Sequence, residues 1–156
     1  MNVNMRQFNL RLLVLFHCIF PLLSGGLIYV LFRSESLNMF QWFNLLGIES
    51  QILSYRTTFH GLKCLFPNWA YLSLPNALWV YSFTSILLII WNDNPFKYWI
   101  IFIPFTTGVL VEFLQLVKLF PGTFDYVDFI FALISFILSI LTINNLIKKK
   151  YEKTSN

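Results

Sequence analysis

Four apolar runs, each long enough to cross a lipid bilayer, constrain the fold of this chain more than any other feature. The runs cover residues 10–32, 74–91, 96–117 and 125–147. A helix needs about 20 mainly apolar residues to cross the hydrocarbon core, and it hydrogen-bonds its own backbone where no water is present. The sequence therefore predicts an all-α fold, a polytopic membrane helix bundle with four transmembrane helices.

The composition agrees with a protein that is dissolved in lipid. Hydrophobic residues make up 57% of the 156 residues and charged residues 12%, whereas about a quarter of a typical soluble domain is charged. The basic residues flank the apolar runs and form no patch interleaved with aromatic side chains, so a nucleic-acid partner is not expected. We expect residues 1–156 to form a single membrane domain whose main partner is the lipid bilayer.

The segment between the first two runs, residues 33–73, has a mixed character. It carries charged side chains among aromatic ones, which makes it too polar to cross the membrane and too apolar for a disordered linker. We expect it to form an interfacial loop along the membrane surface. Within it, residues 37–48 favour a short helix that ends near Gly47.

The distribution of basic residues predicts the orientation of the chain. If the N-terminus is cytoplasmic, seven of the 11 Lys and Arg residues lie on the cytoplasmic side and four lie outside. Because cytoplasmic loops are enriched in Lys and Arg, this orientation is favoured over its inverse. Both the N- and C-termini should therefore be cytoplasmic, which agrees with an even number of spans.

Glu112 is a carboxylate embedded in the third apolar run. An ionisable group at that depth is costly unless it faces the bundle interior or a partner. Gly108, Glu112 and Gln115 recur at helical spacing and share one face. We expect this face to point inward, with Gly108 allowing a second helix to approach closely. Because the third helix runs outward, Glu112 should lie near the outer surface of the membrane.

The fourth run carries a stripe of small and polar residues at helical spacing on an otherwise bulky helix. The stripe comprises Asp128, Ala132, Ser135, Ser139 and Thr142. Such a stripe packs against protein rather than lipid. The Pro121-Gly122 turn is short, so the third and fourth helices should form an antiparallel hairpin. This hairpin would bring together four candidate substrate-binding residues, which are Glu112, Gln115, Asp125 and Asp128.

The same residues also have structural explanations. Asp125-x-x-Asp128 is close to a capping box, in which case both aspartates would only neutralise the positive end of the fourth helix. Glu112 would then form a structural hydrogen bond with Gln115 or with a neighbouring helix. His17, in the first run, is expected to be packed or hydrogen-bonded, because no metal ligands accompany it. No metal site and no cofactor are predicted.

Two short motifs lie on the third and fourth helices and the turn between them. They are Glu112-x-x-Gln115 and Pro121-Gly122-Thr123-Phe124-Asp125-x-x-Asp128. With them, the chain resembles the VanZ-like membrane family over residues 100–145, and the best-known member of that family is associated with teicoplanin resistance. The resemblance implies a multi-pass protein of the bacterial cytoplasmic membrane that acts in the cell envelope.

The chain departs from the pattern of that family at two positions. Thr123 stands where the family has an arginine in the turn, and Ala132 stands where it has an asparagine. An arginine beside buried carboxylates would bind an anionic group or set their charge. Without it, we expect a more acidic site.

Three functions fit these features. The first is non-catalytic binding or shielding at the outer face of the membrane, where the carboxylates bind a polar or cationic group of an antibiotic or envelope precursor. The second is a membrane enzyme for a lipid-linked or envelope substrate, with Glu112 and Asp128 sharing a proton as acid and base. The third is an accessory subunit that binds other membrane subunits through residues 33–73. The sequence favours the first, because few candidate catalytic groups are available.

Overall fold

The computed structural model describes residues 10–35, 38–120 and 124–155, and every regular element within these ranges is a helix. The elements are a π-helix η1 (Leu15–Ile19), α2 (Phe20–Phe32), α3 (Asn38–Leu45), α4 (Glu49–Phe59), a 3₁₀-helix η2 (His60–Leu65), α5 (Asn68–Leu72), α6 (Leu74–Ile90), α7 (Lys97–Leu116) and α8 (Tyr126–Ser155). The prediction of an all-α fold is confirmed. The predicted turn at residues 121–123 lies outside the described residues.

Three helices are long and apolar enough to cross a membrane. They are Leu10–Phe32, which contains η1 and α2, Lys97–Leu116 and Tyr126–Lys148. These helices match three of the four predicted runs. The run predicted at residues 74–91 forms α6, which is apolar but has only 17 residues, a length of about 25 Å at the usual rise per residue.

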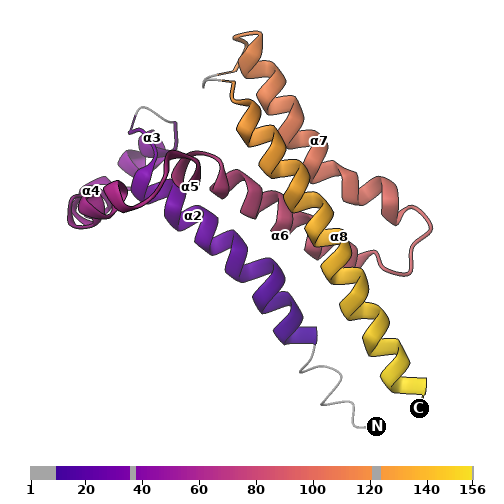
Figure 1. Ribbon diagram of the computed structural model, residues 1–156. Helices are drawn as coiled ribbons and strands as arrows, with labels where there is room; N and C mark the ends of the chain where they lie inside the picture. The colour runs from indigo at the N-terminus through magenta and orange to yellow at the C-terminus, as the bar shows by residue number, and fades with distance from the viewer. Residues whose placement is uncertain (1–9, 36–37, 121–123, 156) are drawn as a thin grey trace.

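The short helix α6 is the centre of the molecule. It packs against α2 with η1, against α7 and against α8, and it lies between α2 and α8 (Figure 1). Its buried side chains cover most of the helix circumference, whereas Phe83 and Ile90 on the remaining face are exposed. The core cluster combines two residues of α6 with residues of α7 and α8, namely Val80, Leu88, Ile101, Ala132, Phe136 and Ile143.

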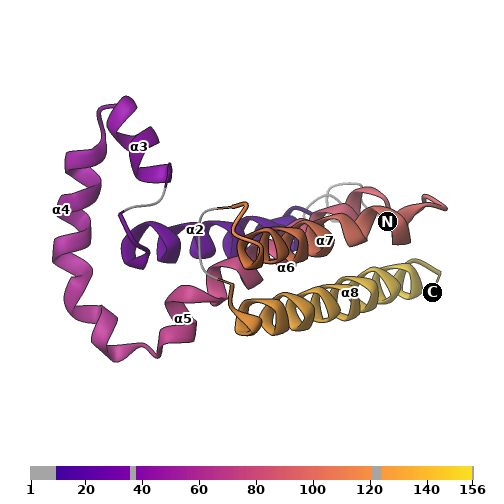
Figure 2. The same ribbon diagram turned by 90° about the horizontal axis from the view of Figure 1, so that it is seen from above.

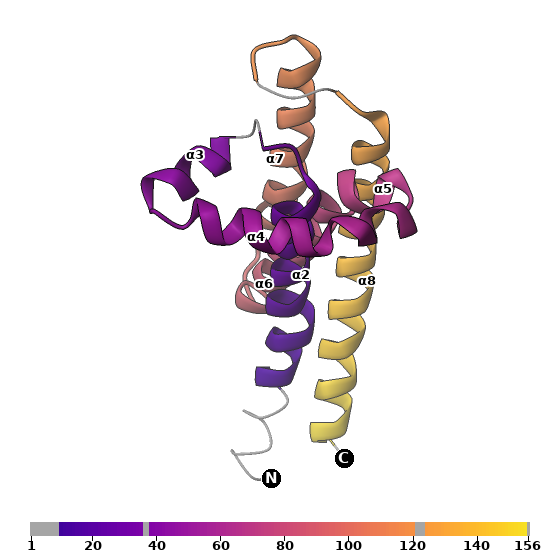
Figure 3. The ribbon, with the colours of Figure 1, turned by 90° about the vertical axis from the view of Figure 1, so that its left-hand side faces the viewer.

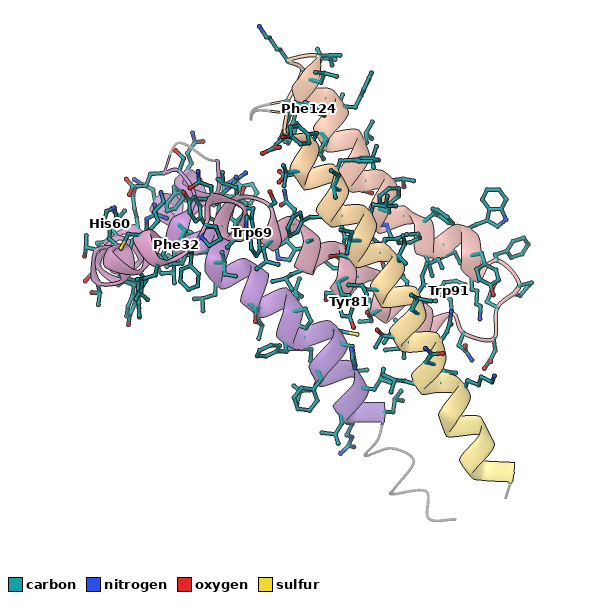
Figure 4. The ribbon with its side chains drawn as sticks, viewed as in Figure 1. Phe32, His60, Trp69, Tyr81, Trp91 and Phe124 are labelled. Atoms are coloured by element: carbon teal, nitrogen blue, oxygen red, sulfur yellow. The ribbon has the colours of Figure 1, made fainter. Side chains whose placement is uncertain are left out.

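Polar side chains join α6 to its neighbours on both sides. Ser85 Oγ lies 3.0 Å from Ser139 Oγ on α8, so the small-residue stripe of α8 packs against protein, as predicted. On the other side, Ser82 Oγ donates to the carbonyl oxygen of Cys18 at 2.5 Å. His17 Nδ1 lies 2.7 Å from Tyr81 Oη, and Tyr81 lies between α2 and α8 in Figure 4. The expectation of a hydrogen-bonded His17 is confirmed.

The segment that follows α2 is helical rather than a loop. Helices α3, α4 and α5 form an arc to one side of the long helices (Figure 2), and α4 runs across the direction of α2 and α8 (Figure 3). Helix α3 ends at Leu45, and Gly47, the predicted stop, follows two residues later with a φ of 70°. The Gly47 and Ile48 N–H groups bond back to carbonyls of α3 at 2.9 and 3.0 Å, a common way to close a helix.

Arg56 connects α4 to the end of α2 by hydrogen bonds. Its guanidinium donates to the carbonyl oxygens of Val30 and, at 2.7 Å, of Arg33. The last carbonyls of a helix have no partner within the helix, so these bonds satisfy groups that would otherwise be unpaired. The same guanidinium lies 3.4 Å from Glu35 Oε1 and 4.8 Å from the centre of the Phe40 ring.

Candidate functional site

Glu112 is buried within α7, with 7% of its surface exposed. Its Oε2 accepts a hydrogen bond from the backbone N–H of Asp125 at 3.2 Å. This bond connects the carboxylate to the residue that precedes α8. Glu112 therefore points into the protein, as expected, but its hydrogen bond is not with Gln115.

Asp128 lies in the first turn of α8 and is equally buried, with 7% of its surface exposed. Asn76 Nδ2 donates to Asp128 Oδ2 at 3.4 Å. The other oxygen, Oδ1, has no hydrogen-bond partner of good geometry among the described residues, although the Ser73 hydroxyl and the Glu112 carboxyl lie close enough to interact with Asp128. The carboxylates of Glu112 and Asp128 lie within electrostatic range of each other. The fold thus brings these two predicted site residues together.

Asp125 has a different role from Asp128. Its Oδ1 accepts the N–H of Val127 at 2.8 Å, which makes Asp125 the N-cap of α8. In a capping box, Asp128 would accept the N–H of Asp125, but that N–H donates to Glu112 instead. Asp125 is therefore a cap, and the reciprocal bond of a capping box is absent, although Asp128 still lies in the first turn, at the positive end of α8.

A cavity of about 1440 Å³ lies between the long helices and the arc of short ones, and Glu112, Gln115 and Asp128 line it. Asp125 is not part of its lining. Gly108 also lines the cavity, and a Cβ atom added there would meet only Val80 Cγ2, at 3.8 Å. Val80 belongs to α6, so α6 does approach α7 at Gly108, at an ordinary van der Waals distance.

Three basic residues that sequence reasoning did not assign to the site line the same cavity. They are Arg33, Arg56 and Lys63. Arg33 lies within electrostatic range of Asp128, and its guanidinium stands 5.4 Å from the centre of the Tyr29 ring. Lys63 Nζ stands 4.9 Å from the centre of the Tyr71 ring. The cavity therefore carries basic as well as acidic side chains.

One sequence signal could have revealed Arg33. It follows directly on the first apolar run, so it lies at the level where that run leaves the membrane. The third run ends and the fourth begins at the same level if four helices alternate in direction. The contributions of Arg56 and Lys63 depend on how α4 and η2 fold back over α2, which no local pattern indicates.

The cavity continues from its charged end into an apolar part. This part is lined by α6 and α7 through Val80, Phe83, Leu87, Ile103 and Pro104, among others. Asn76 and Leu87 mark its two ends on α6, and the 1.5 Å rise per residue puts them about 16 Å apart. The cavity thus combines a charged end with an apolar channel.

The chain matches no protein-family model, no curated protein and no solved structure. Among the residues that the structure describes, no three His, Cys, Asp or Glu side chains form a group that could hold a metal ion. The chemistry available at the site is therefore that of two buried carboxylates, two amides and nearby cations. Such groups can bind a polar or charged ligand.

Proposed function

We propose that this chain is a VanZ-like integral membrane protein of the bacterial cell envelope. It crosses the cytoplasmic membrane four times, with both termini in the cytoplasm and with α7 and α8 as an antiparallel hairpin. The motif residues support this proposal, because Glu112 and Asp128 lie together although they come from different helices. The excess of Lys and Arg on one side supports the orientation.

In this proposal α6 also crosses the membrane, and it completes the set of four spans as the second in chain order. Its 17 residues lie at the lower end of the range of about 17–25 for membrane helices. Helices α2, α7 and α8 cover it, so its polar side chains meet protein rather than lipid. The arc of α3, α4 and α5 then lies along the outer surface, with α4 across the direction of the spans (Figure 3).

We infer that the protein binds, rather than transforms, a polar or cationic group of an envelope precursor or antibiotic at the outer face of the membrane. The observation that carries this inference is the unpartnered Asp128 Oδ1 in the wall of the cavity. A buried carboxylate is costly unless it is paired, and a cationic ligand beside Glu112 would pair it. Binding of this kind requires no cofactor.

Two alternative functions, a membrane enzyme and an accessory subunit, are each supported by one observation. The interaction between the Glu112 and Asp128 carboxyl groups fits an enzyme in which two carboxylates share a proton. Exposed apolar side chains on and after α3, such as Trp42, Leu45 and Leu46, fit an accessory subunit that binds a larger complex.

The test measures teicoplanin susceptibility and cell-surface teicoplanin in a susceptible Gram-positive host that expresses the protein. Glu112→Gln and Asp128→Asn keep the shape of each side chain and remove its charge. The matched control is Asp93→Asn, an exposed carboxylate outside the cavity. We expect both cavity variants to accumulate normally and lose the phenotype, whereas the control keeps it.

Full phenotype in both cavity variants would refute the binding site. Mass spectrometry of lipid-linked precursors separates the enzyme from the binding protein. A covalently altered precursor that disappears in Glu112→Gln would show catalysis, whereas unchanged precursors with a lost phenotype agree with binding.

A further inference from the structure

The charges that line the cavity balance. Three cations, Arg33, Arg56 and Lys63, face three carboxylates, Glu35, Glu112 and Asp128. Arg56 and Glu35 pair with each other at 3.4 Å. No ion pair joins Arg33 or Lys63 to Glu112 or Asp128. Arg33, Lys63, Glu112 and Asp128 therefore have no ion-pair partner at contact distance, although Arg33 lies within electrostatic range of Asp128.

These unpaired charges lie on different walls of the cavity. Glu112 and Asp128 belong to α7 and α8, whereas Arg33 follows α2 and Lys63 belongs to η2. In Figure 4, Phe124 lies beside the start of α8 and His60 lies in the arc of short helices. A ligand that spans this end of the cavity would meet negative charge on one wall and positive charge on the other.

The acceptors on the acidic wall suit a primary ammonium. Such a group has three N–H donors, whereas a quaternary ammonium has none. Asp128 Oδ1 is without a partner, and Glu112 retains acceptor capacity beyond its bond with the Asp125 N–H. Gln115 supplies an amide oxygen from the same face of α7. Three acceptors are therefore available for the three donors.

The apolar part of the cavity suits one lipid chain. Its length along α6, about 16 Å, is close to half of the roughly 30 Å thickness of a hydrocarbon core. The charged end then lies at the level of lipid head groups, and the channel between α6 and α7 covers the depth of one leaflet. An acyl chain is long and apolar enough to fill this channel.

We propose that the cavity binds a zwitterionic membrane lipid whose head group carries a phosphodiester and a primary ammonium. The ammonium lies between Glu112 and Asp128, the phosphodiester lies near Arg33 and Lys63, and one acyl chain follows α6 and α7. This inference rests on the proposed function, because it names the class of ligand that the same carboxylates bind. An anionic lipid would leave both carboxylates unpaired, so it is the weaker ligand.

The experiment is a lipid titration of the purified full chain in detergent, followed by native mass spectrometry. The probes are phosphatidylethanolamine, phosphatidylglycerol and phosphatidylcholine with identical acyl chains. We expect phosphatidylethanolamine to bind most tightly. Glu112→Gln and Asp128→Asn should each weaken its binding about tenfold or more, because each removes a charge-assisted hydrogen bond to the ammonium. The same variants should leave phosphatidylglycerol binding almost unchanged.

Two further variants test the rest of the cavity. Arg33→Gln should weaken phosphatidylethanolamine and phosphatidylglycerol alike, because both carry the phosphodiester. Gly108→Leu adds bulk to the cavity wall beside Val80 and should weaken all three lipids without changing a charge. Asp93→Asn is the control that should bind like the unaltered chain. Circular dichroism of each variant confirms that the helices are intact.

Equal binding of phosphatidylethanolamine and phosphatidylglycerol, or binding that ignores both carboxylate variants, would overturn the proposal. Glycerophosphoethanolamine has the same head group without acyl chains, so it tests whether the ligand is a lipid. If it displaced phosphatidylethanolamine at the same concentration as the lipid, the proposal would be overturned. A lost teicoplanin phenotype with intact lipid preference in Glu112→Gln would refute this inference alone. Lost preference with intact phenotype would refute the proposed function and leave the lipid site standing.

Discussion

The contact between α2 and α6 at Gly25 leads to a quantitative prediction. A Cβ atom added at Gly25 would lie 3.0 Å from the carbonyl oxygen of Pro75 and 3.0 Å from two ring atoms of Trp79. Non-bonded carbon atoms prefer a separation of about 3.5–4.0 Å. Gly25→Ala therefore forces the two helices apart or displaces the indole, which also lines the cavity.

Gly26, the next residue, is the matched control, because nothing lies within 4 Å of a Cβ atom added there. Alanine gains about 1 kcal/mol over glycine in a helix at both positions, whereas overpacking of a tight contact costs about 1–3 kcal/mol. Comparison of the two variants removes the helix-propensity gain that they share. Gly25→Ala should therefore be less stable than Gly26→Ala by about 1–3 kcal/mol.

The assay is reversible unfolding in mixed micelles by titration with a denaturing detergent, followed by circular dichroism. The measured quantity is the difference in free energy of unfolding between the two variants. Equal stabilities, or a less stable Gly26→Ala, would show that α2 and α6 do not meet at this face, and the packing described above would be wrong.

Three other predictions address the ends of helices and the topology. Asp125→Ala removes the N-cap of α8 and should lower the free energy of unfolding by about 1 kcal/mol, whereas Asp125→Asn, which can still cap, should change it little in the same assay. Lys118, two residues after the end of α7, adopts a φ of 59°, so Lys118→Gly should stabilise the protein by up to about 1 kcal/mol in thermal unfolding. Cys64 is exposed, and in intact cells a membrane-impermeant maleimide should label it from outside. A Cys64→Ser, Lys153→Cys chain should be labelled only after the cells are opened, and labelling in intact cells would contradict the proposed orientation.

The sequence predicted those parts of the fold that depend on local information. The helices Leu10–Phe32, Lys97–Leu116 and Tyr126–Lys148 follow from the length and apolarity of their runs. The stop at Gly47 follows from the left-handed conformation that glycine adopts readily. The N-cap at Asp125 was one of two explanations that the local motif allowed, and only the contact with Val127 separates them.

The features that the sequence did not predict depend on contacts between distant parts of the chain. The central position of α6 is one of them, because its run resembles the others in apolarity and differs mainly in small polar residues such as Ser82 and Ser85. The cations of the cavity are another. Lys63 lines the same cavity as the carboxylates only because the arc of short helices folds back over the end of α2. No residue spacing in the sequence predicts that these short helices fold back over α2.

The bonds from Arg56 to the end of α2 determine which wall of the cavity can move. If α4 swung outward, the carbonyl groups of Val30 and Arg33 would lose their donors, so this wall resists displacement. The opposite wall contains Pro104, which lacks an N–H and therefore weakens α7 at a position that faces the cavity. Gating motions that admit a bulky molecule would then bend α7 about Pro104, while α2 and α4 act as the rigid frame.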